Sequence, residues 1–162
     1  MFEKTGIPES EKILSVFPSE ERLNRGPVAV IECFQEIPCN PCQSACKIGA
    51  ITVGCDINAV PKLDETKCTG CALCISKCPG RAIMVLDGSV REGFTEMKIP
   101  YEFLPLPEMG QMVKALDRAG KYITDVEVLK VLNPPAFDRT PVVSLLVPDG
   151  LITVVRNIRT EA

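Results

Sequence analysis

The 162-residue sequence contains no histidine and no tryptophan, and aromatic residues make up only 5% of it. The absence of histidine removes the commonest general base and excludes both Cys2His2 zinc sites and Rieske-type iron–sulfur ligation. The longest apolar runs, such as residues 142–147, are far too short to span a membrane. A net charge of −3 gives no basic excess for binding nucleic acid. The chain is therefore a poor candidate for substrate chemistry on its own.

Cysteine, in contrast, is abundant, because nine of the residues are cysteines. Such a number would suggest disulfides in a secreted protein, but residues 1–8 contain no apolar core of a signal peptide. The cysteines also cluster at metal-binding spacings. These features together predict a reduced, cytoplasmic metalloprotein.

The most specific motif is C-x2-C-x2-C-x3-C-P, formed by Cys68, Cys71, Cys74, Cys78 and Pro79. Thiolates two residues apart can wrap one side of a 4Fe–4S cluster from a single tight loop, which Gly70 allows to turn. Cys78 is expected to begin a helical turn. Two C-x2-C pairs could also bind zinc, but the third cysteine and the Cys-Pro favour iron–sulfur chemistry.

An internal repeat links this motif to an earlier one. Residues 46–53, CKIGAITV, align with residues 78–85, CPGRAIMV, and this places Cys42 opposite Cys74 and Cys39 opposite Cys71. Each half is expected to form a strand, a cysteine loop, a short helix and a strand. The two halves differ at Glu36, which stands where the second half has Cys68.

Residues 27–90 resemble the bacterial two-cluster ferredoxins, in which the fourth cysteine of each motif binds the other cluster. The resemblance implies two 4Fe–4S clusters, or one at minimum, in a pseudo-two-fold (βαβ)2 domain. The ligands that it implies are Cys68, Cys71, Cys74 and Cys46 for one cluster and Cys39, Cys42 and Cys78, with one further residue, for the other. Lys47 departs from the family, which usually has proline there.

Cys33 is the first candidate for the missing ligand, because it ends a predicted strand over residues 28–33 and begins the loop. Cys55 is the alternative, although it lies beyond the next predicted strand and could be a free cysteine. Ligation by Glu36 or a three-iron cluster are further alternatives.

The fold class expected is α+β, with four segments along the chain. Residues 1–26 form an N-terminal arm with a short helix capped by Ser10, 27–94 the two-cluster domain, 95–107 a proline-rich extended connector and 108–162 a small α+β appendage. In the appendage we expect a helix over residues 109–116, strands over 122–132 and 141–147, and a helix or strand over 151–158. A strand over 82–86 should end in a hairpin at Asp87–Gly88.

The motifs and the appendage together resemble the small ferredoxin-type subunits of heteromeric FAD-containing oxidoreductases similar to amino-acid or imino-acid dehydrogenases. This resemblance implies an electron-transfer subunit that is not catalytic alone, has no small-molecule substrate of its own and exchanges single electrons with a partner flavoprotein. The cluster module has no net charge excess for steering a soluble carrier, which favours permanent membership of a complex. A free-standing ferredoxin and a metal-stabilised structural or interaction module are the alternatives.

Overall fold

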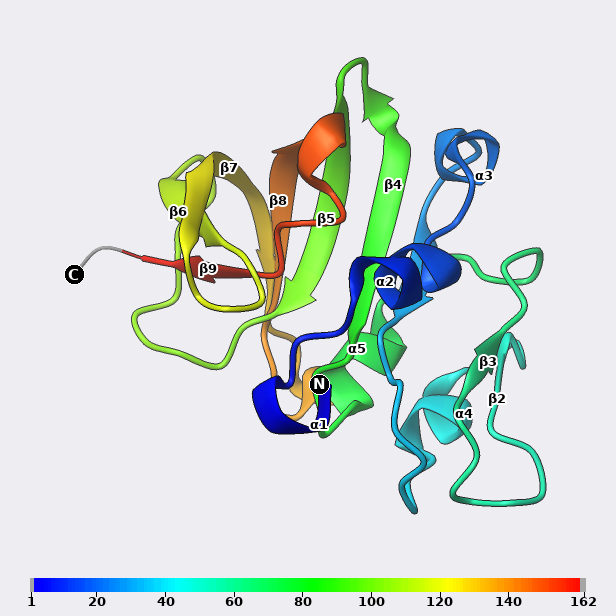
Figure 1. Cartoon of the computed structure of the whole chain (residues 1–162). Coiled ribbons are helices and arrows are strands. Elements are labelled where there is room, and N and C mark those ends of the chain that lie inside the picture. Colours follow the sequence, from blue (N-terminus) through cyan, green and yellow to red (C-terminus); the bar gives the residue numbers. More distant parts are fainter. Residues whose placement is uncertain (1, 161–162) are drawn as a thin grey trace.

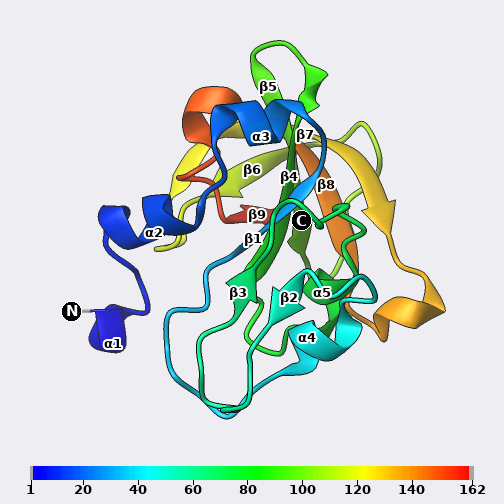
Figure 2. The ribbon, with the colours of Figure 1, turned by 90° about the vertical axis from the view of Figure 1, so that its right-hand side faces the viewer.

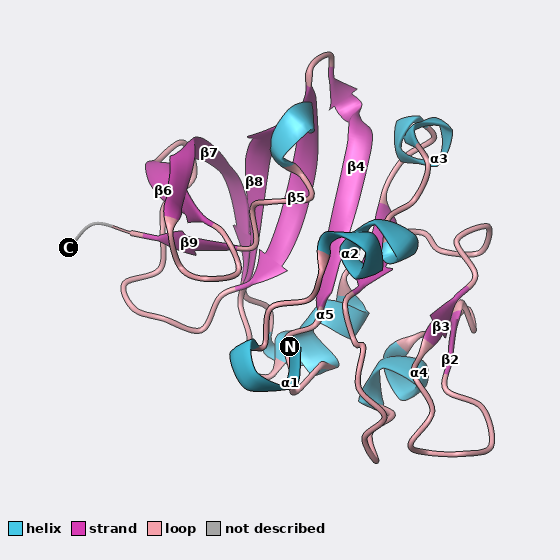
Figure 3. Cartoon of the chain, viewed as in Figure 1, coloured by secondary structure: helices cyan, strands magenta, loops and turns pink. Residues whose placement is uncertain are grey.

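The computed structural model describes residues 2–160, so the first residue of the expected arm and the last two of the expected appendage lie outside the described range. The fold is α+β, with antiparallel strands and few, short helices (Figures 1 and 3). Seven strands form one sheet in the order β1-β4-β5-β8-β7-β6-β9, and β2 pairs with β3 in a separate ribbon. Among the described helices, none is long and apolar enough to cross a membrane.

The elements follow one another in a simple order along the chain. They are α1 (Phe2–Thr5), α2 (Ser10–Val16), α3 (Glu20–Asn24), β1 (Val28–Ile31), α4 (Pro41–Ala45), β2 (Ile51–Thr52), β3 (Lys62–Leu63), α5 (Leu73–Lys77), β4 (Ile83–Arg91), β5 (Phe94–Pro100), β6 (Met112–Leu116), β7 (Tyr122–Leu132), η1 (Pro135–Phe137), β8 (Val142–Pro148), η2 (Asp149–Leu151) and β9 (Asn157–Arg159).

The two halves of the repeat form β1-α4-β2 and β3-α5-β4, as their sequence pattern predicts. The first strand of each half pairs with the last strand of the other. Val28–Ile31 lies antiparallel to residues 83–86, and Ile51–Thr52 lies antiparallel to Lys62–Leu63. The halves are therefore joined at both ends, and the helices α4 and α5 lie against each other between them.

Strand β4 is longer than the sequence predicts, because Asp87–Gly88 does not end it. These residues form an irregularity in the pairing with β5, and the Asp87 carboxylate accepts hydrogen bonds from the backbone and side chain of Ser89. Gly88 packs against Leu23 of α3. The strand continues to Arg91, and the hairpin turn lies at residues 92–93.

The C-terminal strands extend the sheet of the repeat. Strand β5 begins at Phe94 and pairs with both β4 and β8, so residues 95–100, expected in an extended connector, form a sheet strand. The strands expected over 122–132 and 141–147 are present as β7 and β8.

The helix expected over residues 109–116 is wrong, because Met112–Leu116 form β6. Val113 and Ala115 are buried, whereas Met109 and Met112 are exposed, so burial alternates as in a strand and does not follow a helical face. Of residues 151–158, the first ends the short 3-10 helix η2 and the last two belong to β9.

Successive residues of a strand point to opposite faces of the sheet, and the buried ones form two hydrophobic cores, one on each face. Val28 and Val30 face the larger one, called here the sheet core, which α3 and the segment around β9 cover (Figure 2). Ala29 and Ile31 face the smaller one, called here the loop core, which contains Cys42, Cys74 and other residues of the cysteine loops. Cys42 and Cys74 are therefore buried on the face opposite Leu23 of α3, whereas the partly buried Cys68 packs against both cores.

The N-terminal arm packs onto this sheet through its third helix. Ser19 caps α3 by accepting a hydrogen bond from the Arg22 backbone, at 3.2 Å, and Leu23 is buried in the sheet core. The cap predicted at Ser10 is wrong, because α2 already begins at Ser10 and Glu9 precedes it without a side-chain cap.

Candidate metal centre

Eight of the cysteines lie in two groups of four, which face the loop core. The first-loop group consists of Cys33, Cys39, Cys42 and Cys78, and the second-loop group consists of Cys46, Cys68, Cys71 and Cys74. Within each group the thiols are near enough to interact electrostatically. Each group takes three cysteines from one loop and the fourth from the other half of the repeat. Ligation by these groups stays a prediction.

The first-loop group surrounds a pocket lined mainly by apolar side chains. All four of its cysteines line this pocket, together with residues such as Ile31, Ile37 and Ile83. Burial raises the pKa of the Cys33 thiol, and the nearby Cys78 and Cys39 raise it further. Burial raises the pKa of Cys42 in the same way. Four thiols in a largely apolar pocket would bind metal as thiolates, whose charge iron would compensate.

The second-loop group is more deeply buried on one side and open on the other. Burial raises the pKa of Cys74 to about 12, with further contributions from Cys68, Cys71 and Cys46. Cys71 is exposed, in contrast. One edge of this group therefore lies near the surface.

The loop that carries this group depends on two residues with positive φ. Gly70 has a φ of 65°, and a Cβ atom there would lie 2.3 Å from the Cβ of Pro27. Ala72 has a φ of 66° and directly precedes α5. The glycine predicted to let the loop turn is therefore also required by its close approach to the chain before β1.

The last cysteine of each motif ends a helix, whereas the sequence predicted that Cys78 begins one. Cys46 is the C-cap of α4 and Cys78 is the C-cap of α5. Each sulfur then accepts a hydrogen bond from the amide four residues on. The distances are 3.2 Å from Ala50 N to Cys46 Sγ and 3.3 Å from Ala82 N to Cys78 Sγ. Such bonds stabilise a thiolate and tune the potential of any cluster it binds.

The second-loop group also receives an amide from the sheet. The Ala29 amide of β1 donates to Cys68 Sγ at 3.3 Å. Arg22 of the arm supports the same loop, because its guanidinium donates to the carbonyl of Cys68 at 3.0 Å and to that of Glu65 at 2.9 Å. The arm therefore holds the start of the cysteine loop against β1.

The alternatives for the missing ligand lie away from the first-loop pocket. Cys55 is exposed and does not line it, and Glu36 is exposed and lines a different pocket beside α1. Cys33 directly lines the pocket with Cys39. The structure thus brings Cys33 together with the other three cysteines and leaves Cys55 and Glu36 outside.

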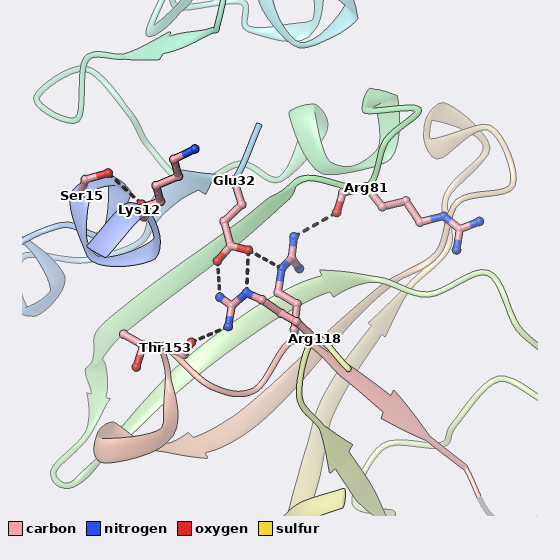
Figure 4. A network of polar contacts seen from close by, with 7 residues as sticks. Lys12, Ser15, Glu32, Arg81, Arg118 and Thr153 are labelled. Carbon is pink, nitrogen blue, oxygen red and sulfur yellow. Dashed lines mark hydrogen bonds and ion pairs between the residues drawn. The ribbon is translucent and has the colours of Figure 1, made fainter. Parts of the chain in front are cut away.

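A buried ion-pair network adjoins the first-loop group, and no sequence motif predicted it (Figure 4). Glu32 binds Arg118 through two hydrogen bonds and Arg156 through one, with Arg118 Nε and Arg156 Nε lying 3.0 Å and 3.2 Å from Glu32 Oε2. Arg118 also donates to the Thr153 carbonyl. Burial lowers the pKa of Arg156, while Glu32 and the nearby Cys78 oppose that shift. The C-terminal segment therefore places positive charge beside a cysteine group.

The two groups fit a cubane by number and chemistry of their donors. Throughout residues 2–160, no three Cys, Asp or Glu side chains are arranged to hold one metal ion. In a cubane each of four thiolates binds a different iron, so the sulfurs need not converge on one point as they do around zinc. Four thiols, apolar walls and amides directed at sulfur are the features that such a cluster requires.

Comparison with protein families identifies part of this region. Residues 61–84 match the family described as a 4Fe-4S binding domain. The matched segment contains Cys68, Cys71, Cys74 and Cys78, and the match supports an iron–sulfur domain of the ferredoxin type. Comparisons with curated proteins and with solved structures gave no match.

Proposed function

We propose that the chain is an electron-transfer subunit that binds two 4Fe–4S clusters and exchanges single electrons with a flavoprotein partner. The observation that carries this proposal is the presence of two four-cysteine groups, of which one contains three cysteines of the matched family segment. A bound cluster would accept and return one electron at a time.

The proposed ligands follow the two groups. Cys46, Cys68, Cys71 and Cys74 would bind one cluster, and Cys33, Cys39, Cys42 and Cys78 the other. This crossing of Cys46 and Cys78 is supported by their place at the C-termini of the adjacent helices α4 and α5, between the two loops. It also agrees with a pseudo-two-fold relation of the halves, which the pairing of their strands supports.

The remaining chain would hold the clusters and limit access of water. Ile31, Ile37 and Ile83 form the apolar wall of one pocket, and the amides of Ala29, Ala50 and Ala82 reach three of the sulfurs. No step of substrate chemistry is assigned to the chain. The partner, proposed from the resemblance to subunits of FAD-containing oxidoreductases, would carry the flavin and the substrate site.

We place this function in the cytoplasm. Within the described residues, which include all nine cysteines, every cysteine is free of a disulfide. Cluster ligands must be reduced thiols, which a reducing compartment maintains.

Anaerobic purification followed by iron and sulfide analysis tests the cofactors. We expect about eight iron and eight sulfide per chain. Dithionite should bleach the visible absorption and produce electron paramagnetic resonance signals of reduced clusters. A colourless zinc protein that dithionite leaves unchanged would contradict the proposal and favour a metal-stabilised structural module.

Native purification tests the partner separately. The chain should elute with larger subunits that contain FAD, and reduced flavin in that complex should reduce the clusters. Elution as a single small protein with intact, reducible clusters would replace the proposed subunit with a free-standing ferredoxin.

A further inference from the structure

The peptide that joins Arg81 to Ala82 connects the C-terminal segment to a cysteine sulfur. Its N–H group donates to Cys78 Sγ at 3.3 Å. Its C=O group accepts a hydrogen bond at 3.0 Å from Nη2 of Arg156. Because donor and acceptor belong to one peptide unit, a charged donor on the oxygen polarises the N–H group and strengthens its bond to sulfur.

Glu32 sets the position of the Arg156 side chain. Glu32 directly follows β1 and is fixed by its own backbone, which donates to the Ala82 carbonyl at 2.7 Å. Its carboxylate then accepts from Arg156 and, through two bonds, from Arg118. The guanidinium of Arg156 is thus held between a carboxylate and the cysteine loop, with its side chain only 13% exposed.

The charges of this network do not cancel. Glu32 and Arg118 form a bidentate pair, so Arg156 is the second cation on one carboxylate. The Arg81 side chain pairs with Glu102, and the Asp117 carboxylate, which lines the same pocket as Arg156, accepts hydrogen bonds from the neutral amides of Ala119 and Lys121. Glu32, Arg118 and Arg156 by themselves thus carry one net positive charge, and Arg156 is the cation that donates toward the cysteine loop.

The first half of the repeat has no such arginine. The equivalent peptide joins Gly49 to Ala50, and its N–H group also donates to a sulfur, that of Cys46. In the part of the chain that the structure describes, no arginine side chain donates to the Gly49 carbonyl. The two halves share the amide–sulfur bond and differ in what polarises it.

We infer that Arg156, oriented by Glu32, is a positioning residue that raises the reduction potential of the cluster bound by the first-loop group. Reduction adds one electron to a cluster that already carries four thiolates. A nearby positive charge and a stronger hydrogen bond to sulfur both stabilise the reduced state more than the oxidised state. The inference rests on the proposed function, because it requires a cluster at this group.

Redox titration of holoprotein variants, followed by electron paramagnetic resonance, tests this role. Arg156→Gln keeps a hydrogen-bond donor and leaves the Glu32–Arg118 pair intact, but removes the charge. We expect one of the two midpoint potentials to fall and the other to stay. Arg156→Lys, which keeps the charge, should remain closer to the wild type. Cys39→Ser identifies the affected cluster, because Cys39 lies in the first-loop group alone.

Arg91→Gln is the matched control, because Arg91 lies at the far tip of the β4–β5 hairpin, where it stacks on Phe94. Its two potentials should equal those of the wild type. Unchanged potentials in Arg156→Gln at full iron content would overturn the inference, as would an equal fall for both clusters or loss of iron from the variant. Wild-type protein that binds no iron at the first-loop group would instead contradict the proposed function.

Discussion

In the second-loop group three cysteines come from residues 68–74, with two residues between neighbours. In the first-loop group five residues separate Cys33 from Cys39. The tight loop needs Gly70 at positive φ against Pro27. The wide loop instead receives Cys33 directly from the end of β1, where Glu32 fixes the backbone. The end of a strand can therefore bring a cysteine to the position that the first motif leaves without one.

The two groups also depend on different terminal segments. Arg22 of the N-terminal arm holds the Cys68 carbonyl, and Arg156 of the C-terminal segment holds the Arg81 carbonyl. Both arginines lie outside the cysteine motifs. The terminal segments are thus part of the support of the centre, in addition to covering the sheet core.

Removal of the iron should have the largest effect, and it should separate the loops from the sheet. Of the described residues, those buried in the sheet core include no cysteine, whereas Cys42 and Cys74 are buried in the loop core. We expect chelation to abolish hydrogen-exchange protection across residues 33–82 while β5, β7 and β8 stay protected. Equal protection of the loops before and after chelation would show that they do not depend on metal.

Glu32→Gln should have the next largest effect, because it leaves two arginines in a buried site without a carboxylate. The Glu32, Arg118 and Arg156 side chains are 6%, 10% and 13% exposed. We expect a loss of about 3 kcal/mol, measured as chemical denaturation of holoprotein at equal iron content.

Glu21→Gln is the control for this change, since the Glu21–Arg25 pair is 77% and 68% exposed. It should cost less than about 1 kcal/mol. Similar losses in the two variants would mean that the network beside the first-loop group contributes no more than a surface ion pair.

Gly70→Ala in the second cysteine loop is compared with Gly49→Ala, where an added Cβ has space. Its Cβ would meet Pro27 at 2.3 Å, so strain and a clash should together cost about 2 kcal/mol and reduce the iron of the second-loop group. Gly49 has an equal φ of 65° but no atom within 4 Å of its added Cβ, so Gly49→Ala should cost only about 1 kcal/mol. Equal iron content and melting temperature in the two variants would contradict a role for the Gly70–Pro27 contact.

The sequence predicted the elements whose pattern is local. Runs of β-branched residues predicted the strands at Val28–Ile31, Tyr122–Leu132 and Val142–Pro148. The internal repeat aligned the two cysteine loops. The helix expected over 109–116 failed because Met109 and Met112, which suggested the helical spacing, are exposed, whereas the buried Val113 and Ala115 are two residues apart as in a strand. Local patterns could not decide between the two.

Such local patterns could not predict which distant side chains form ion pairs or which strands lie side by side. Glu32 meets Arg118 and Arg156 across 86 and 124 residues of chain, and no spacing in the sequence relates them. The continuity of the sheet from β4 through β5 to β8 was missed for the same reason, because strand order depends on which edges meet in space. A charged residue near the end of a predicted strand and next to a cysteine, such as Glu32, is the one local signal available.

Iron analysis of two alanine variants tests the assignment of Cys33 to the first-loop group directly. Cys33→Ala should lose the first-loop cluster or convert it to a three-iron cluster, so iron should fall from about eight per chain toward about four to seven. Cys55→Ala should keep about eight iron and an unchanged resonance spectrum. Full iron in Cys33→Ala together with loss of a cluster in Cys55→Ala would contradict the account and make Cys55 the ligand.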